Sequence, residues 1–477
     1  MHASSLAPPP EQVAKLLSEH GFVRVKEHDV PTKAGSYFYT RNQSSIIAYR
    51  VPENYDPANG FVVIGAHTDS PVLKLKPVTK ISRGEMLCVG VECYGGGLWY
   101  TWFDRDLSIA GRVLVETADG TVESRLVCVK EPIVRIPNLA IHLNRGVNSE
   151  GFKFNMETEL VPILASQLMT NVIAAKTGFG KAPEDKKPEG KSEATPEFKC
   201  CGGEVPTAVS YKDLNVKTPE FHTQHHYNLL QLIAKEAGCE VDAIRNFELC
   251  LYDTQPAQLT GLYKEFIASR ALDNLMMSYC ATEALIRAGP SKQIQVVALF
   301  DNEEIGSQSM MGADSNAMAK FFAKFNARPE LTQAAVDKSI LVSADMAHGI
   351  HPNYESKHES NHRPTLQKGI VIKHNGNLRY ATNIVSAHHI QSIAKKYNIP
   401  VQQFCVRNDS PCGSTIGPML SASCGIRTVD VGIPQWAMHS IRETCGVADV
   451  ESVIELFSHV YEEFAAFDST LKVDADK

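Results

Sequence analysis

The 477-residue chain has no apolar run that approaches the roughly 20 residues needed to cross a bilayer. Its net charge of -7 excludes the broad basic surface by which proteins bind nucleic acids or acidic membranes. Its first ten residues lack a basic segment followed by an apolar core, so we expect no signal peptide. The twelve cysteines contain no Cys-x-x-Cys pair, and the adjacent Cys200 and Cys201 are badly placed to bridge each other. These absences favour a cytoplasmic protein with reduced thiols and with neither nucleic acid nor membrane as a partner.

The length of the chain and its changes of pattern predict two domains. A single ordinary core does not accommodate 477 residues. Buried strands alternate with helices at both ends of the chain, whereas short alternating runs between 93 and 241 indicate a β-rich insertion. Within the insertion, residues 181–199 are rich in Lys, Glu and Pro and are expected to form a mobile loop. The predicted fold is α/β, a three-layer α/β/α domain with a mostly parallel sheet (1–92 and 242–477) plus the β-rich insertion (93–241).

Two adjacent carboxylates follow the most apolar strand of the sequence. The run from Val296 to Phe300 is typical of a strand buried on both faces, and Glu303 and Glu304 come soon after its end. Neighbouring buried carboxylates repel each other, and a bound cation would remove the conflict. We interpret Glu304 as a metal ligand and Glu303 as the group that moves a proton. The alternative is a solvated acidic turn.

A second buried strand ends on a histidine. The strand from Phe61 to His67 is followed by Asp69, and residues two apart in extended chain point the same way. This arrangement suits a ring nitrogen bound to a metal and a carboxylate that steers it. A purely structural hydrogen bond between the two side chains is the alternative.

Three more side chains complete a candidate metal site. Asp273 lies near a predicted helix start, where it either caps the helix or bridges two cations. Asp345 ends a third apolar strand, and His439 lies just beyond the last strand. Because ligands collect at the carboxyl ends of strands in such sheets, these residues can converge. With His67 and Glu304 they make the ligand set of a dinuclear zinc site, which activates a water for attack while Glu303 takes its proton.

The order and the amino-acid sequences of these motifs resemble those of the aspartyl aminopeptidase family of two-zinc metallopeptidases. The likeness covers nearly the whole chain. The matching stretches are Ala66-His67-Thr-Asp69-Ser-Pro71, Ser269-Arg-Ala-Leu-Asp273-Asn274, Phe300-Asp-Asn-Glu303-Glu304-Ile-Gly306, Ser343-Ala-Asp345-Met-Ala-His348, Asn408-Asp-Ser-Pro-Cys-Gly-Ser-Thr-Ile-Gly417 and Ala437-Met-His439-Ser-Ile-Arg-Glu443. One departure is Ala271, where the family motif has Arg-Leu-Asp, so the local helix start differs from the expected pattern.

The resemblance implies a role for each metal-site residue. The ligands divide between two zinc ions per subunit, with His67 and Asp345 on one, Glu304 and His439 on the other, and Asp273 bridging both. Asp69 would orient His67, and Glu303 would be the general base that later passes its proton to the leaving amine. One of the two metal positions could also accept manganese or cobalt.

The resemblance also implies substrate-binding residues and an assembly. Lys373 would bind an acidic side chain, which has physical sense because a lysine near two cations is repelled unless a substrate carboxylate lies between them. Tyr380 would donate to the oxyanion, and His348, Glu303 and Asp345 would contact the substrate. His142 of the insertion would reach a neighbouring subunit's active site. The family forms tetrahedral dodecamers, with the insertion as the dimerisation domain.

We therefore predict a cytoplasmic zinc aminopeptidase that removes N-terminal Asp or Glu from peptides. A two-zinc amidohydrolase acting on N-acylated amino acids is an alternative, because the same ligand set serves both reactions. An assembly or cargo-binding scaffold without catalysis is another, although it would have no need of Glu303.

Overall fold

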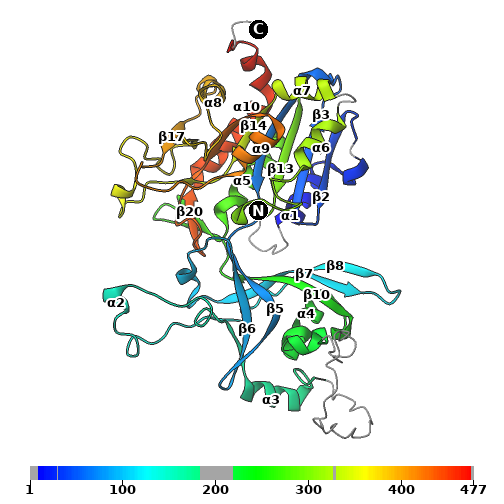
Figure 1. Ribbon diagram of the computed structural model, residues 1–477, viewed down its shortest axis with the longest axis vertical. Coiled ribbons are helices and arrows are strands. Elements are labelled where there is room, and N and C mark those ends of the chain that lie inside the picture. The colour runs from blue at the N-terminus through cyan, green and yellow to red at the C-terminus, as the bar shows by residue number, and fades with distance from the viewer. Residues whose placement is uncertain (1–8, 30, 183–218, 326–328, 474–477) are drawn as a thin grey trace, which may run out of the picture.

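The computed structural model describes residues 9–29, 31–182, 219–325 and 329–473, which form two lobes (Figure 1). Most of the predicted 181–199 loop and both Cys200 and Cys201 lie outside the described residues. Among the helices of the described residues, none combines the length and the apolar character that crossing a bilayer requires.

The upper lobe is built on a nine-stranded mixed sheet. Its strand order is β1-β2-β3-β13-β4-β14-β18-β16-β17, and the central strands β13, β4, β14 and β18 run parallel. The strands are β1 (Val23–Arg24), β2 (Gly35–Arg41), β3 (Ser45–Val51), β4 (Phe61–His67), β13 (Ile294–Phe300), β14 (Ile340–Ala344), β16 (Ile370–His374), β17 (Val401–Cys405) and β18 (Arg427–Gly432). The predicted strands ending at His67, Phe300 and beside Asp345 are thus neighbours in one sheet.

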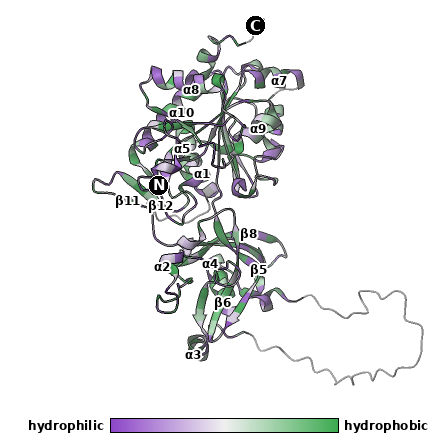
Figure 2. Cartoon of the chain, turned by 60° about the vertical axis from the view of Figure 1, so that its left-hand side comes forward, coloured by the Kyte–Doolittle hydropathy of each residue, from purple (hydrophilic) through white to green (hydrophobic). Residues whose placement is uncertain are grey.

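Helices cover both faces of this sheet, so the expected three-layer α/β/α arrangement is confirmed. One apolar core contains side chains of α1 (Pro9–Glu19), α5 (Leu272–Arg287), α8 (Ile384–Lys396) and α10 (Val447–Asp468). The other contains side chains of α6 (Ala317–Lys324), α7 (Pro329–Asp337) and α9 (Ile416–Cys424). The strands between these layers are apolar and lie at the centre of the lobe (Figure 2).

The lower lobe is formed around a six-stranded antiparallel sheet of order β8-β7-β10-β5-β6-β9. Its elements are β5 (Val72–Arg83), β6 (Met86–Tyr94), β7 (Leu107–Glu116), β8 (Val122–Cys128), β9 (Ile163–Ser166) and β10 (Ile244–Asp253), with α2 (Val147–Glu150), α3 (Gln167–Thr177) and α4 (Tyr227–Ala237). This sheet extends beyond the expected insertion of 93–241 at both ends. Strands β5 and β10 pair with each other and with lower-lobe strands, and neither joins the nine-stranded sheet.

A third, five-stranded sheet borders the region where the two lobes meet. Its order is β11-β12-β20-β19-β15, formed by β11 (Gln258–Thr260), β12 (Phe266–Ser269), β20 (Glu443–Gly446), β19 (Pro434–Trp436) and β15 (Ala347–His348). Strand β12 leads into the segment that holds Asp273, and β19 leads to His439. The sheet therefore supports two of the predicted ligand segments.

Candidate metal centre

Asp273 lies at the centre of the predicted site. Its carboxylate is buried, with Oδ1 3.4 Å from His67 Nε2 and Oδ2 3.3 Å from His439 Nε2. The two oxygens of one carboxylate thus face two different histidines. Groups of side chains able to hold a metal lie on both sides of it: His67, Asp273 and Asp345 on one side, and Asp273, Glu304 and His439 on the other.

The backbone around Asp273 is irregular. This irregularity includes Ala271, where the sequence differs from the family motif. Ala271 has a left-handed conformation with φ of 54°, and Asp273 and Asn274 have non-helical backbone angles although they precede a regular helix. Ala271 rather than Asp273 occupies the N-cap position of α5, and the Asp273 carboxylate faces the two histidines. Ser70 Oγ donates a 2.6 Å hydrogen bond to the Asp273 carbonyl and helps to fix this turn.

His67 presents its Nε2 atom to the first group. This atom lies 3.5 Å from Asp345 Oδ2, while Nδ1 faces Asp69, 3.1 Å from its carbonyl oxygen and 3.4 Å from its Oδ1. A hydrogen bond from Nδ1–H to Asp69 fixes the tautomer that leaves the Nε2 lone pair for a metal. Burial disfavours protonation of His67, but Glu303, Asp273 and Asp345 outweigh it and raise the pKa of the imidazole.

His439 has the same orientation in the second group. Its Nε2 atom lies 3.3 Å from Glu304 Oε2, and its Nδ1 lies 3.0 Å from the carbonyl oxygen of Gly96. The glycine-rich segment that follows β6 of the lower lobe therefore contacts a predicted ligand directly. Gly95, with φ of +76°, packs so closely that a Cβ there would lie 3.2 Å from Glu304 Cβ. A side chain at this position would press on the ligand.

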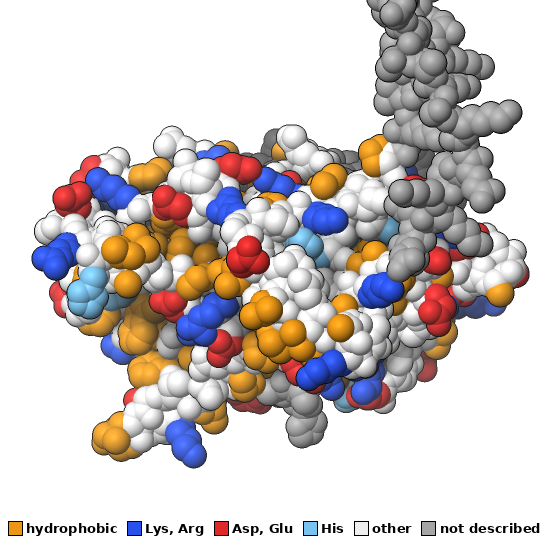
Figure 3. Space-filling view, turned by 90° about the horizontal axis from the view of Figure 1, so that it is seen from below, with side chains coloured by type: hydrophobic (Ala, Val, Ile, Leu, Met, Phe, Trp, Pro, Cys, Tyr) orange, Lys and Arg blue, Asp and Glu red, His pale blue; other side chains and the backbone are white. Residues whose placement is uncertain are grey.

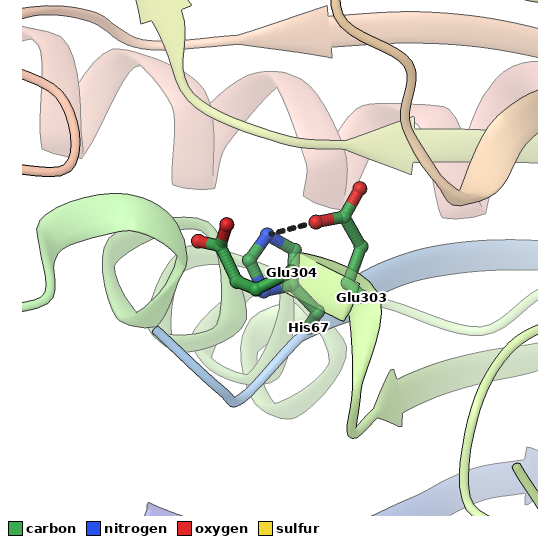
Figure 4. Close-up of side chains that lie close together, drawn as sticks. All are labelled: His67, Glu303 and Glu304. Atoms are coloured by element: carbon green, nitrogen blue, oxygen red, sulfur yellow. Dashed lines mark ion pairs between the residues drawn. The ribbon is translucent and has the colours of Figure 1, made fainter. Parts of the chain in front are cut away.

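Asp69 holds the Glu303–Glu304 segment. Its two carboxylate oxygens accept hydrogen bonds of 3.1 Å from the backbone N–H groups of Glu303 and Glu304. Figure 4 shows the two glutamates on either side of the His67 ring, with Glu303 Oε2 3.7 Å from His67 Nε2. Glu303 therefore faces the cluster. Burial raises the pKa of both glutamates, because the charged carboxylate is poorly solvated there.

The cluster contains more carboxyl groups than the described cationic side chains can pair. Six buried or nearly buried carboxyl groups lie together, against the ammonium of Lys373 and two imidazoles: Asp69, Asp273, Glu303, Glu304, Asp345 and Glu443. Asp273 Oδ1 and Glu304 Oε1 have no hydrogen-bond partner among the described residues although both are buried. Orphaned buried oxygens beside imidazole nitrogens suit a divalent cation, and this donor set is one that zinc prefers. The residues present thus fit a metal.

Lys373 and Tyr380 lie on the Asp345 side of the cluster. Lys373 Nζ donates a 2.8 Å hydrogen bond to Asp345 Oδ1 and lies 5.4 Å from the centre of the Tyr380 ring. Both residues are buried. Burial raises the pKa of the Tyr380 hydroxyl, which keeps it a hydrogen-bond donor.

Two predicted substrate residues have different surroundings. His348 lines a cavity of about 270 Å³ with Phe404, Trp436 and Met438, directly beside the cluster because Met438 precedes His439. His142 is exposed on a turn of the lower lobe, and the cluster forms without it.

Two contributors were missed at the sequence level. Glu443, which ended a quoted motif without a role, accepts hydrogen bonds from the backbone N–H groups of Asp273 and His439. Tyr94 donates a 2.8 Å hydrogen bond to Asp69 Oδ2. Tyr94 ends β6 and Glu443 begins β20, and neither follows one of the apolar strands of the nine-stranded sheet on which the prediction was based. The position of Glu443, four residues after His439, was a usable signal.

Comparisons with known proteins identify the family. The family model described as aminopeptidase I zinc metalloprotease (M18) matches residues 10–461. A probable aspartyl aminopeptidase of Ricinus communis is 47% identical, with 97% of this chain and 94% of that protein covered. An aspartyl aminopeptidase of Dictyostelium discoideum is also 47% identical, with 95% and 93% covered.

Solved structures agree on the fold. The structure of the Ape4 and Nbr1 complex matches with a TM-score of 0.85 and 39% identity, covering 99% of this chain and 86% of that one. The S. cerevisiae mApe1 dodecamer matches with a TM-score of 0.78 and 26% identity, covering 97% and 95%. The predicted family and the predicted class of metal-dependent aminopeptidase are confirmed. The chain belongs to the aminopeptidase I (M18) family of zinc metalloproteases.

Proposed function

We propose that this chain removes N-terminal aspartate or glutamate from peptides with the help of two zinc ions per subunit. The observation that carries the proposal is the Asp273 carboxylate, whose two oxygens each face a separate group of metal-type ligands. Zinc is the metal of the family, and manganese or cobalt could replace it at one position. Relatives with 47% identity carry the name aspartyl aminopeptidase, which supports the acidic specificity.

In this proposal His67 and Asp345 would hold one zinc, Glu304 and His439 would hold the other, and Asp273 would be a ligand of both. Bound zinc supplies Lewis acidity, which lowers the pKa of an attacking water toward neutrality. Asp69 keeps His67 and the Glu303 backbone in place through the hydrogen bonds described above.

Glu303 accepts the proton of the attacking water and returns it to the leaving amine. Its carboxylate faces the cluster and belongs to neither ligand group that contains Asp273. Glu303 also forms a third metal-capable group with His67 and Glu304, and the proposal assigns it to the proton rather than to a zinc. Tyr380 donates its hydroxyl hydrogen to the oxyanion that develops at the scissile carbonyl. His348 and the cavity beside it provide room for the substrate.

Lys373 binds the acidic side chain of the substrate. Replacing Lys373 with methionine should lower kcat/KM for peptides with N-terminal Asp roughly 10- to 100-fold, because a hydrogen bond between two charged groups is lost. Rates on matched peptides that begin with Asp, Leu or Lys measure the effect. The wild-type enzyme should prefer Asp, and the variant should lose most of that preference.

The exposed Lys368, which precedes the same strand, provides the control Lys368→Met. It should behave as wild type. Zinc content must be compared as well, because Lys373 contacts Asp345. Best cleavage of the Leu peptide by the wild type would contradict the role of Lys373. Activity on an N-acetylated substrate but not on its free-amine form would instead support a deacylase.

We further propose that the chain assembles into a homo-oligomer, a tetrahedral dodecamer, with the lower lobe as its dimerisation domain. The yeast mApe1 relative is a dodecamer. Figure 3 shows apolar side chains gathered on the end of the lower lobe. Leu168 and Met169 of α3 are exposed at 70% and 53%. The turn with His142 also exposes Leu139 at 60% and Leu143 at 74%, which a second copy would bury. The unpaired state of the ten described cysteines supports a cytoplasmic location.

If His142 serves the active site of a neighbouring subunit, two inactive variants should complement each other. Subunits with His142→Ala keep Glu303, and subunits with Glu303→Gln keep His142. Random reassembly of equal amounts should restore about a quarter of wild-type activity, because intact sites form only between unlike neighbours. Light scattering would report the assembly. If a mixed assembly of the correct size showed no recovery, His142 would not serve the active site of a neighbouring subunit.

A further inference from the structure

Glu443 is a buried carboxylate that contacts the backbone of two predicted ligand segments at once. Its Oε2 accepts a 2.9 Å hydrogen bond from the N–H of Asp273, and its Oε1 accepts a 2.7 Å hydrogen bond from the N–H of His439. The residue is only 1% exposed. Both oxygens are therefore committed to the ligand segments rather than to water.

These two segments have backbone conformations that need external support. Ala271, Ala437 and His439 have φ values of 54°, 56° and 65°, in the left-handed region that side chains other than glycine rarely adopt. Each such residue is strained and persists only where its surroundings fix it. Glu443 supplies a fixed acceptor at both places.

The five-stranded sheet explains why one residue can reach both segments. Strand β20, which begins at Glu443, lies between β12 and β19, and Glu443 is opposite Ser269 in the register. The chain leaves β12 toward Asp273 and leaves β19 toward His439. Glu443 thus lies where the two segments diverge.

We propose that Glu443 is a positioning residue that sets the distance between Asp273 and His439 and so fixes the second metal position. This inference rests on the proposed two-zinc function. It mirrors the contact that Asp69 makes with Glu303 and Glu304, so that the backbones of four cluster residues are held by two buried carboxylates. Neither carboxylate needs to touch the metal for this purpose.

The substitution Glu443→Gln tests the inference with little change of shape. A glutamine side chain has one acceptor oxygen, and its amide group would face the second N–H, so one of the two hydrogen bonds must be lost. The zinc dissociation constant of the second site should rise roughly 10- to 100-fold, as is typical when an outer partner of a ligand is removed. Competition with a coloured chelator measures this constant without any assay of turnover.

Asp449 provides a matched control. It is also buried, and its carboxylate accepts hydrogen bonds of 2.7 Å and 2.8 Å from the backbone N–H groups of Gln367 and Gly369. Those residues are not part of the cluster. Asp449→Asn should lower the melting temperature of the metal-free protein by an amount similar to Glu443→Gln while leaving zinc affinity unchanged.

Three results distinguish the possibilities. Weaker zinc binding confined to Glu443→Gln, with altered visible absorption of the cobalt-loaded protein, supports the inference. Equal zinc affinity in Glu443→Gln and wild type overturns it, whereas a wild type that binds no zinc overturns the proposed function as well. If Glu443→Gln does not fold, hydrogen exchange of the backbone amides in the wild type tests the inference instead. Exchange of the Asp273 and His439 amides as fast as that of exposed loops would exclude the hydrogen bonds to Glu443 and overturn the inference.

Discussion

Replacing Asp273 with asparagine is expected to remove both zinc ions and, with them, all measurable turnover. The two oxygens of Asp273 face the two groups separately, so the neutral amide weakens both sites together. The loss of affinity should exceed the roughly 10- to 100-fold effect of removing an outer partner, because a charged ligand itself is lost. Metal analysis per subunit after gel filtration measures the result.

A variant of a residue that binds only one of the two zinc ions provides the comparison for Asp273→Asn. His439→Ala should weaken the site that it shares with Glu304 and leave the site of His67 and Asp345 occupied. Asp273→Asn should empty both. If Asp273→Asn retained as much zinc as His439→Ala, Asp273 would serve one metal only, and the two-metal arrangement would have to be abandoned.

Replacing Glu303 with glutamine is expected to lower kcat roughly 10²- to 10⁴-fold while zinc content stays unchanged. The side chain keeps its shape but can no longer take a proton from the attacking water. Its carboxylate lies 3.7 Å from His67 Nε2, within the cluster, whereas each group built around Asp273 is complete without it. Activity should therefore fall without loss of metal.

Steady-state kinetics and metal analysis on the same sample check this prediction. Glu283→Gln is a suitable control, because Glu283 lies on α5 of the same lobe and pairs with Arg287 outside the cluster. It should show wild-type kinetics. Unchanged turnover in Glu303→Gln would point to a different base, whereas a wild type without turnover would favour an assembly scaffold. Loss of zinc in Glu303→Gln would make Glu303 a ligand.

Much of the cluster could be predicted because strand ends are visible in a sequence. The strands before His67 and Glu303 can be recognised from their apolar composition. Because these two strands are parallel neighbours in one sheet, their carboxyl ends lie close together. The metal-binding roles themselves stay predictions until metal is measured. Asp273 was harder to place, because its irregular backbone follows from Ala271 and from contacts with Ser70 and Glu443 that no local pattern reveals.

The lobe boundaries show where a single sequence fails. Strand β10 lies within 242–477, which was predicted to belong to the upper-lobe domain, yet it pairs antiparallel with β7 in the lower lobe. Strand β5 begins only a few residues after β4 and already belongs to the other sheet. Which partner a strand chooses depends on residues far away in the chain, whereas local periodicity reports only that a strand exists.

The Gly96 carbonyl receives the His439 Nδ1 hydrogen, and the Leu98 N–H donates to the His439 carbonyl; both residues lie between β6 and β7 of the lower lobe. The lower lobe therefore takes part in orienting a predicted ligand of the upper lobe. A change in the relative position of the two lobes is expected to change the orientation of this imidazole.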